Sequence, residues 1–355
     1  MILEGKSVLI VGGTGSLGRI LVRRILSGEA GIPRKVVVLS RDEAKQNEMR
    51  RWYLRKRAVT DEVIYDNFRQ LLEFRIGDVR DYGDVCRAVK SADIVFSAAA
   101  LKQVPTCEYF PEQALLTNCM GPVNISRAIV ENDYDVETVV GISTDKACKP
   151  VNVMGMTKAL QERIFIAANL LTSRTRFVAA RYGNVLASRG SVIPLFHEQI
   201  LGGGPVTVTS PDMTRFLMTL DDAVDLILAT VRDASPGEVS VPLCQSATVL
   251  DIAHALIDGR PIDVEITGMR PGEKLHEILI SEEEIRHVRR RGDYLTIVPM
   301  LPELAEENAE PYGELTREYS SADCVGTRDD TAALLEKHGL LVGQAPPKSG
   351  EELLR

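Results

Sequence analysis

A chain of 355 residues with 45% hydrophobic and 26% charged side chains can bury a sizeable core, as an ordinary globular protein does. Its net charge of −8 argues against an extended nucleic-acid surface, and no apolar run reaches the roughly eighteen residues of a membrane-spanning helix. The N-terminal residues lack the layout of a signal peptide, and the six cysteines and five histidines show no metal-ligand spacing. We therefore expect a cytoplasmic protein with reduced thiols, no bound metal, and neither nucleic acid nor membrane as a partner.

Short apolar runs alternate with amphipathic stretches through the first half of the chain. Six of these runs predict buried parallel strands, at Ser7–Val11, Lys35–Leu39, Glu73–Ile76, Ile94–Ser97, Thr138–Ile142 and Phe177–Ala180. Helical patterns separate most of them, so the order predicts an α/β fold with a Rossmann-like, doubly wound parallel sheet in residues 1–182. The looser, glycine- and proline-rich sequence at 183–340 predicts a smaller C-terminal substrate-binding domain. Part of 217–246 is expected to return to the sheet, and 341–355 to form a tail.

A glycine-rich loop connects the first predicted strand to an amphipathic helix. Gly12 and Gly15 permit a tight turn and close approach to a pyrophosphate, and Gly18 lets the helix pack on the strand. The helix N-terminus, near Ser16, would then face the phosphates. Because strand, loop and helix occur in the required order, the motif predicts a dinucleotide site, with a purely structural glycine turn as the alternative.

The end of the second predicted strand bears on the choice of cofactor. An NAD site would place an acidic residue there to accept a hydrogen bond from the ribose 2′-hydroxyl, whereas this chain has Ser40 and Arg41. A hydroxyl and a guanidinium suit a 2′-phosphate, so the sequence favours NADP. The alternative is that Arg41 stacks on adenine or lies in solvent. Asp78 follows the third strand and is a candidate for contact with the adenine amino group. We further expect the cofactor site to include Val79, Ala98 and Ala100.

The stretch STDKACKPVNVMGMTK, residues 143–158, follows the fifth predicted strand. In open α/β sheets the carboxyl ends of the strands face the ligand, so Thr144, Asp145 and Lys146 are candidate active-site residues. The alternative interpretation is a charged pair in a surface turn. We expect the positive charges of Lys158 and an oxidised nicotinamide to depress the pKa of Lys146, while Asp145 opposes this effect.

The second half of this stretch begins a predicted helix at 153–169, in which Met154 and Lys158 share one face. Lys158 can therefore reach a nicotinamide ribose while Met154 faces the substrate pocket. In the nucleotide-sugar short-chain dehydrogenases, which this segment resembles, a tyrosine four residues before the lysine is the catalytic base. A thioether cannot accept a proton, and a positioned general base contributes roughly 10²–10⁴-fold to a rate. Activity would thus require another group to replace the tyrosine.

The sequence resembles UDP-N-acetylglucosamine 4,6-dehydratases of polysaccharide biosynthesis, within the extended short-chain dehydrogenase/reductase superfamily. It is most similar to the soluble, short forms, some of which also carry methionine in place of the tyrosine. The matching stretches are GGTGSLG, SRDEAKQNEMR, GDVRD, AAALKQVPTCEYFP, STDKACKPVNVMGMTK, RYGNVLASRGSVIPLF, PDMTRFLMTLDDAV and MRPGEKLHE. They extend from the glycine loop to Glu277, and several are specific to the family.

The resemblance implies a reaction in three steps. Hydride leaves C4 of the sugar for NADP⁺, a proton leaves C5 while water leaves from C6, and hydride returns to C6. Similarity assigns Asp145 as the acid for the 6-hydroxyl and Lys146 as the base at C5. Thr144 can hydrogen-bond the 4-hydroxyl. Lys146, Asp145 and water are all candidates for the base that takes the proton of this hydroxyl.

The same resemblance implies UDP-N-acetylglucosamine as the substrate and a homo-oligomer, either a dimer or a hexamer. It places Lys102 near the sugar and Asn118 behind the active-site helix. It also implies four contacts with UDP. Arginine pairs bidentately with phosphate and carboxylates bind ribose hydroxyls, so the arginines and the glutamate among these four residues match the groups of UDP in chemical type. These contacts are Asn184, Arg215, Arg270 and Glu273. Pro122 departs from the family, whose members more often have threonine there.

Two other functions fit parts of this sequence. A UDP-hexosamine 4-epimerase would use the same fold but needs no acid at C6, so Asp145 and Lys146 weigh against it. A catalytically silent NADP-binding protein would explain Met154. The chain nevertheless contains both the residues expected to bind the cofactor and substrate and those expected to eliminate water, which argues against a silent protein. Inversion or retention at C5, the downstream pathway and the oligomer size lie beyond the sequence.

Overall fold

The computed structural model describes residues 1–54, 59–186, 191–304 and 314–343, so the 344–355 part of the expected tail lies outside the described residues. Within them the chain forms a central sheet of nine strands in the order β13-β14-β9-β6-β5-β4-β1-β2-β3. The strands are β1 (Ser7–Val11), β2 (Lys35–Ser40), β3 (Leu72–Ile76), β4 (Ile94–Ser97), β5 (Thr138–Thr144), β6 (Arg176–Tyr182), β9 (Val239–Pro242), β13 (Val288–Arg291) and β14 (Tyr294–Ile297).

The sheet is doubly wound, which confirms the predicted fold class. Strands β1 to β6 and β9 run parallel, and only β14 runs antiparallel to its neighbours, β9 and β13. All six predicted strands are present, and their ends differ from the prediction by two residues at most. Their sequences are continuous apolar runs because helices cover both faces of the sheet.

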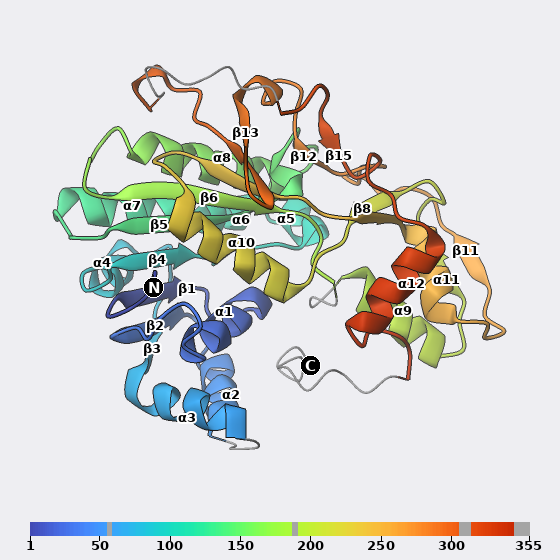
Figure 1. Ribbon diagram of the computed structural model, residues 1–355, viewed down its shortest axis with the longest axis horizontal. Coiled ribbons are helices and arrows are strands. Elements are labelled where there is room, and N and C mark those ends of the chain that lie inside the picture. The colour runs from blue at the N-terminus through green and yellow to red at the C-terminus, as the bar shows by residue number, and fades with distance from the viewer. Residues whose placement is uncertain (55–58, 187–190, 305–313, 344–355) are drawn as a thin grey trace.

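Alternate residues of each strand reach opposite layers of helices (Figure 1). Val8 and Ile10 of β1 pack in the core with α1 and α10, whereas Leu9 and Val11 pack in the core with α4 and α7. One layer contains α1 (Ser16–Leu26), α2 (Glu43–Tyr53), α3 (Val59–Leu71) and α10 (Leu220–Asp233); the other contains α4 (Tyr82–Val89), α7 (Gly121–Glu131) and α8 (Val153–Ala168). Helix α8 confirms the helix predicted at 153–169.

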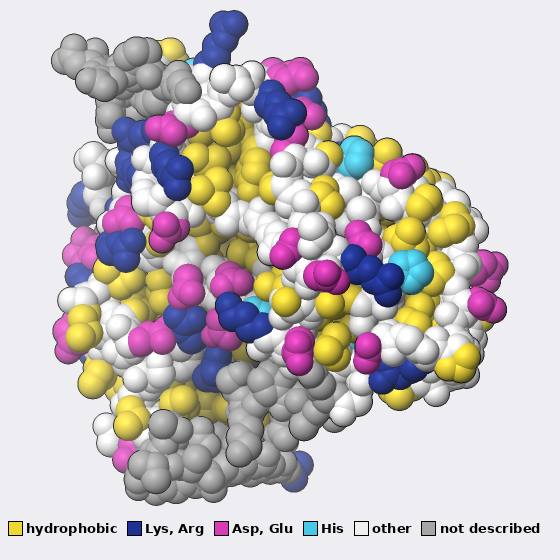
Figure 2. All heavy atoms as spheres, turned by 45° about the vertical axis from the view of Figure 1, so that its right-hand side comes forward, with side chains coloured by type: hydrophobic (Ala, Val, Ile, Leu, Met, Phe, Trp, Pro, Cys, Tyr) yellow, Lys and Arg dark blue, Asp and Glu magenta, His cyan; other side chains and the backbone are white. Residues whose placement is uncertain are grey.

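A second lobe has its own apolar core and lies beside the sheet (Figure 1). It contains α9 (Val192–Leu201), α11 (Val249–Ile257), α12 (Arg328–Lys337), β7 (Val206–Val208) and β11 (Val264–Ile266). Phe196, Ile252 and Leu335 are fully buried between its elements. The chain crosses between the lobes several times, because α10, β9, β13 and β14 belong to the sheet layers. Acidic and basic side chains are interspersed over the face that Figure 2 shows.

Short pairs of strands connect the two lobes near the carboxyl edge of the sheet. β8 (Thr214–Phe216) pairs with β10 (Ser246–Thr248), and β12 (Ile278–Ile280) pairs with β15 (Tyr319–Ser320). The segments that precede β12 and follow β15 thereby lie next to the end of β5, where the candidate catalytic residues are found.

The close contact between α1 and the glycine loop generates a stability prediction. A Cβ on Gly18 would lie 2.5 Å from the Cα of Gly13, and this backbone atom cannot move without deforming the loop. We expect Gly18→Ala to lower the free energy of unfolding by about 1–3 kcal/mol, as overpacking usually does. Gly15→Ala is the matched control, because its Cβ would meet nothing closer than 3.4 Å. Chemical denaturation of both variants should separate them, and equal losses would contradict this explanation.

Candidate active site

A cavity of about 630 Å³ runs along the carboxyl ends of the central strands. It reaches from the glycine loop and the end of β2, past the ends of β4 and β5, to the first turns of α8 and the segment after β6. The predicted site residues that line it are Gly12, Gly15, Ser16, Gly18, Ser40, Arg41, Val79, Ala98, Ala100, Lys102, Thr144, Asp145, Lys146, Met154, Lys158 and Asn184. Those that do not are Asp78, Asn118, Arg215, Arg270 and Glu273.

The glycine loop has the shape that a pyrophosphate requires. Gly12 has a φ of +85°, and a Cβ there would lie 2.6 Å from the backbone nitrogen of Ala99, so only glycine fits. No side chain caps the N-terminus of α1, and its first turn contains no acidic residue. The partial positive charge of the helix end therefore faces the cavity without a competing anion, which suits a bound diphosphate.

The end of the cavity that lies at the carboxyl end of β2 carries two cations. Arg41 lies about half exposed, with its Nη1 3.7 Å from the Asp78 carboxylate. Asp78 also pairs with Arg80 at 2.6 Å and is outside the cavity lining. The Ser40 hydroxyl accepts a hydrogen bond from Gln46 at 2.9 Å.

Lys45, which the sequence analysis did not single out, is the second of these cations. It lines the cavity, and its Nζ lies 3.0 Å from the Asp42 carboxylate. The signal that the sequence offered was its position in the first turn of α2, directly after the stretch SRDE and one further residue.

Lys158 lies buried at the middle of the cavity. Its Nζ donates to the carbonyl of Ile142 and, at 2.6 Å, to Oε1 of Gln161. Burial lowers the pKa of Lys158 to about 8, although the charge of Glu162 opposes the shift. Both hydrogen bonds hold the ammonium against the end of β5, on the α8 face that lines the cavity.

Asn118 connects two walls of the site without entering it. Its amide donates to Thr157 of α8 at 3.0 Å and to the carbonyl of Leu101, and its Oδ1 accepts from the backbone N–H of Leu101 at 2.8 Å. It belongs to a single π-helical turn, Leu116–Met120, between α6 (Pro111–Leu115) and α7. Such turns inside helices are frequent at functional sites.

Met154 contributes an apolar patch to the cavity wall. Its side chain is 5% exposed and packs in a small cluster with Cys107 and Ala114. Leu101 and Val104 flank this cluster. A shape-filling role therefore agrees with its surroundings.

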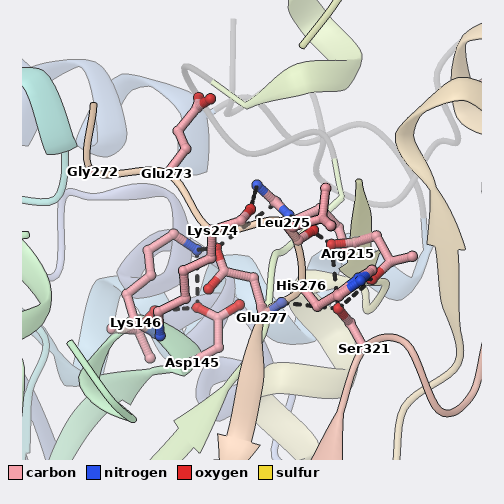
Figure 3. A network of polar contacts seen from close by, with 12 residues as sticks. Asp145, Lys146, Arg215, Gly272, Glu273, Lys274, Leu275, His276, Glu277 and Ser321 are labelled. Atoms are coloured by element: carbon pink, nitrogen blue, oxygen red, sulfur yellow. Dashed lines mark hydrogen bonds and ion pairs between the residues drawn. The ribbon is translucent and has the colours of Figure 1, made fainter. Parts of the chain in front are cut away.

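A buried group of charges lies at the end of β5 (Figure 3). Lys146 places its Nζ 3.0 Å from Oδ1 of Asp145 and 3.2 Å from Oε1 of Glu277. Thr144 donates its hydroxyl to the same Asp145 oxygen at 2.8 Å. The second oxygens of Asp145 and Glu277 are buried and accept no hydrogen bond from the described residues. Glu277 was not recognised as a site residue in the sequence, although it ends the matching stretch MRPGEKLHE.

Glu277 changes the ionisation expected for this group. Burial would lower the pKa of Lys146, but the two carboxylates raise it further, so the net shift is upward. The sequence analysis weighed only Asp145 against the positive charges near Lys146, and Glu277 adds a second carboxylate that raises the pKa of Lys146. Burial also raises the pKa of Asp145; Lys146 opposes the shift and Glu277 adds to it.

The remaining expected substrate residues lie around this group. Arg215 of β8 donates to the carbonyls of Lys274 and Leu275, and its Nε lies 3.8 Å from Glu277. Arg270 is exposed, and Figure 3 shows the Glu273 side chain directed away from the Lys146 contacts. The loop between Arg270 and Glu273 contacts the start of α8, because Asn152 donates to the carbonyl of Gly272 at 2.8 Å. Asn184 lines the cavity, and its buried Oδ1 has no hydrogen-bond partner among the described residues.

Comparison with known proteins identifies the family. Residues 8–299 match the family model described as "Polysaccharide biosynthesis protein". The chain belongs to this family. It is 42% identical over 297 residues to the UDP-glucose 4-epimerase of Rickettsia canadensis, with 82% of each chain covered. It is also 42% identical over 307 residues to an uncharacterized membrane protein of Methanocaldococcus jannaschii, covering 83% of this chain and 86% of that one. Among the helices described here, none is long and apolar enough to cross a bilayer.

Solved structures show the same fold. Pen from Bacillus thuringiensis superimposes with a TM-score of 0.83 at 32% identity, covering 96% of this chain and all (100%) of that one. DesIV, a dTDP-glucose 4,6-dehydratase from Streptomyces venezuelae with NAD and TYD bound, gives a TM-score of 0.64 at 22% identity, covering 76% and 86%. The chain thus shares its architecture with nucleotide-sugar epimerases and dehydratases that use a nicotinamide dinucleotide.

Proposed function

We propose that this protein is an NADP-dependent UDP-N-acetylglucosamine 4,6-dehydratase. It would make a UDP-2-acetamido-2,6-dideoxy-4-keto-hexose for polysaccharide or glycan biosynthesis, with the configuration at C5 left open. The observation that carries the proposal is the pair formed by the buried Asp145 and the partly exposed Lys146, which lines the same cavity as Lys158. Loss of a 6-hydroxyl needs an acid and a base at one place, and this pair supplies both types of group.

Each residue of the site has a defined task in this reaction. Bound NADP⁺ would accept the hydride of C4 and return it to C6. Lys158 orients the nicotinamide ribose, and its ammonium adds positive charge beside the reacting carbon. Asp145 protonates the departing 6-hydroxyl, which its raised pKa favours. Lys146 accepts the C5 proton after passing its own proton to a carboxylate, and both Asp145 and Glu277 lie in reach.

We place the UDP end of the substrate where the cavity reaches Asn184 and approaches the loop between Arg270 and Glu273. Asn184 offers a buried, unpaired oxygen within the cavity, and Lys102 lines it near the sugar. Arg270 and Glu273 border the loop whose Gly272 carbonyl accepts a hydrogen bond from Asn152, and Arg215 donates to the carbonyl of Lys274 just after it. Two arginines and a carboxylate match a diphosphate and ribose hydroxyls in chemical type.

A 4-epimerase is the second candidate, because curated relatives carry that name. Both reactions begin with oxidation at C4, but only the dehydratase needs an acid at C6. Incubation with UDP-N-acetylglucosamine should therefore release water and produce a C6 methyl group that NMR detects. Formation of UDP-N-acetylgalactosamine without a methyl signal would support the epimerase. An unchanged substrate, with NADP bound, would support a catalytically silent protein.

A homo-oligomer is part of the proposal, with dimer and hexamer both open. The side chains that favour it are apolar and 38–49% exposed, and they lie on α6, the π-helical turn and α8: Leu115, Leu116, Met120, Met156 and Leu160. Met156 and Leu160 are one turn apart on α8, which contacts both of the other segments. Clustered apolar side chains on a surface mark contact sites.

The cofactor preference is tested at Arg41. Its salt bridge to Asp78 is long and exposed, so it contributes little to stability and leaves the guanidinium available for a 2′-phosphate. We expect Arg41→Ala to weaken NADP⁺ binding by about tenfold or more, the effect of losing one charge-assisted contact. Binding of NAD⁺ should stay unchanged. Arg127→Ala is the control, since this exposed arginine pairs with Glu131 on α7, away from the cavity. Equal loss for both cofactors would contradict a role at the 2′-phosphate.

The role of Met154 is tested by a pair of variants. Met154→Leu keeps volume and apolarity, and such exchanges usually cost less than about 1.5 kcal/mol, so turnover should stay within about tenfold. Lys146→Ala removes a general base and should lose at least about 10²-fold. Turnover of UDP-N-acetylglucosamine is measured in both, with cofactor occupancy checked. An inactive Met154→Leu enzyme beside an active Lys146→Ala enzyme would show that the chemistry is misplaced.

A further inference from the structure

Arg181, Glu162 and Glu284 form a second buried group of charges, and none of the three lines the cavity. Arg181 of β6 donates to the Glu162 carboxylate from Nε at 2.9 Å and from Nη2 at 2.7 Å. It also donates to Glu284 from Nη1 and Nη2, both at 2.8 Å. One guanidinium thus meets two carboxylates, which leaves this buried group with one negative charge that Arg181 does not balance.

Glu162 is the member of the group that lies against the cavity wall. It follows Lys158 by four residues, so both side chains lie on one face of α8. Ser143 lines the cavity and donates its hydroxyl to Oε1 of Glu162. The ammonium of Lys158 donates to the carbonyl of Ile142, the residue before Ser143. The carboxylate and the ammonium are therefore fastened to adjacent residues of β5.

We propose that Glu162 is a positioning residue that holds Lys158 in the cavity as an ammonium, beside the place of the nicotinamide. This inference rests on the proposed function in one respect, the binding of a nicotinamide dinucleotide. An ammonium repels the positive ring of the oxidised nicotinamide and not the neutral ring of the reduced form, so it favours acceptance of hydride from the sugar. Glu162 does not line the cavity and acts through Lys158.

The charges around Lys158 agree with this role. Burial lowers the pKa of Lys158 to about 8, and the charge of Glu162 is the larger of the effects that oppose the shift. Cys119 of the π-helical turn also faces Lys158, but burial raises the pKa of this thiol, which keeps it uncharged at pH 8. Burial likewise raises the pKa of Tyr182, which lines the cavity at the end of β6. Asp145, which follows β5, is paired with the next residue at 3.0 Å.

Glu284 provides a matched control for Glu162. Both carboxylates are buried, and each accepts two hydrogen bonds from Arg181. Glu284 belongs to the segment between β12 and β13, and the pKa of Lys158 responds to Glu162 and not to Glu284. In either Glu→Gln variant Arg181 keeps one carboxylate, so a neutral pair stays buried and we expect both variants to fold.

The experiment compares the binding of NADP⁺ and NADPH by isothermal titration calorimetry, from about pH 6 to about pH 10, a range that spans the pKa of Lys158. In the wild type the Kd for NADP⁺ divided by that for NADPH should fall as pH rises through the region near 8, because loss of the ammonium removes repulsion from the oxidised ring. Glu162→Gln should move this fall about one pH unit or more downward. Glu284→Gln, and Glu162→Asp, which keeps the charge, should fall with the wild type. Lys158→Met should show no fall.

Gln161→Glu tests the same interaction with the buried group intact. Gln161 already accepts from Lys158 at 2.6 Å, so a carboxylate there should move the fall upward. An unmoved fall in this variant or in Glu162→Gln would overturn the inference, as would an equal shift in Glu284→Gln or a fall that persists in Lys158→Met. A wild-type ratio that does not change with pH would overturn it too.

The assay separates this inference from the dehydratase, because it contains no sugar nucleotide. A shift confined to Glu162→Gln and Gln161→Glu, in a protein that releases no water from UDP-N-acetylglucosamine, would sustain the role of Glu162 and reject only the dehydratase. Failure of the wild type to bind either dinucleotide would overturn both.

Discussion

One ammonium shared between two buried carboxylates is the interaction on which the candidate site depends. Lys146 lies 3.0 Å from the Asp145 carboxylate and 3.2 Å from that of Glu277, and Arg215 lies 3.8 Å from Glu277. Removing one member of such a group leaves an uncompensated buried charge, which is costly in proteins. The group can therefore exist only where the end of β5, the start of β12 and β8 are held together.

The C-terminal part of the chain provides this restraint. Ser321 accepts from the backbone N–H of Glu277 at 3.0 Å and donates its own N–H to the Glu277 carbonyl at 2.8 Å, and its hydroxyl lies 2.6 Å from that of Thr214 (Figure 3). Thr214 also contacts His276 at 2.8 Å. Ser321, which directly follows β15, therefore holds the backbone of Glu277 and also contacts Thr214, the residue before Arg215.

The sequence predicted those features that depend on neighbouring residues. Apolar runs buried on both faces indicate parallel strands, and a strand, a glycine loop and a helix in that order predict the turn found at Gly12, because each signal is complete within about twenty residues. Glu277 was missed because its partner Lys146 is far away in the sequence, and only the three-dimensional fold brings them to 3.2 Å. The contribution of Glu277 to the pKa of Lys146 was missed for the same reason. Met154, by contrast, was assigned an apolar role from its chemistry alone, and its packing with Cys107 agrees.

The central claim is that the hydride removed from C4 returns to C6 of the same sugar while water leaves. UDP-N-acetylglucosamine that carries deuterium at C4 tests this most directly, with the product analysed by NMR and mass spectrometry. We expect the deuterium to appear in the new C6 methyl group and C4 to become a ketone. Deuterium retained at C4 of a product that keeps its 6-hydroxyl would contradict the account and indicate an epimerase.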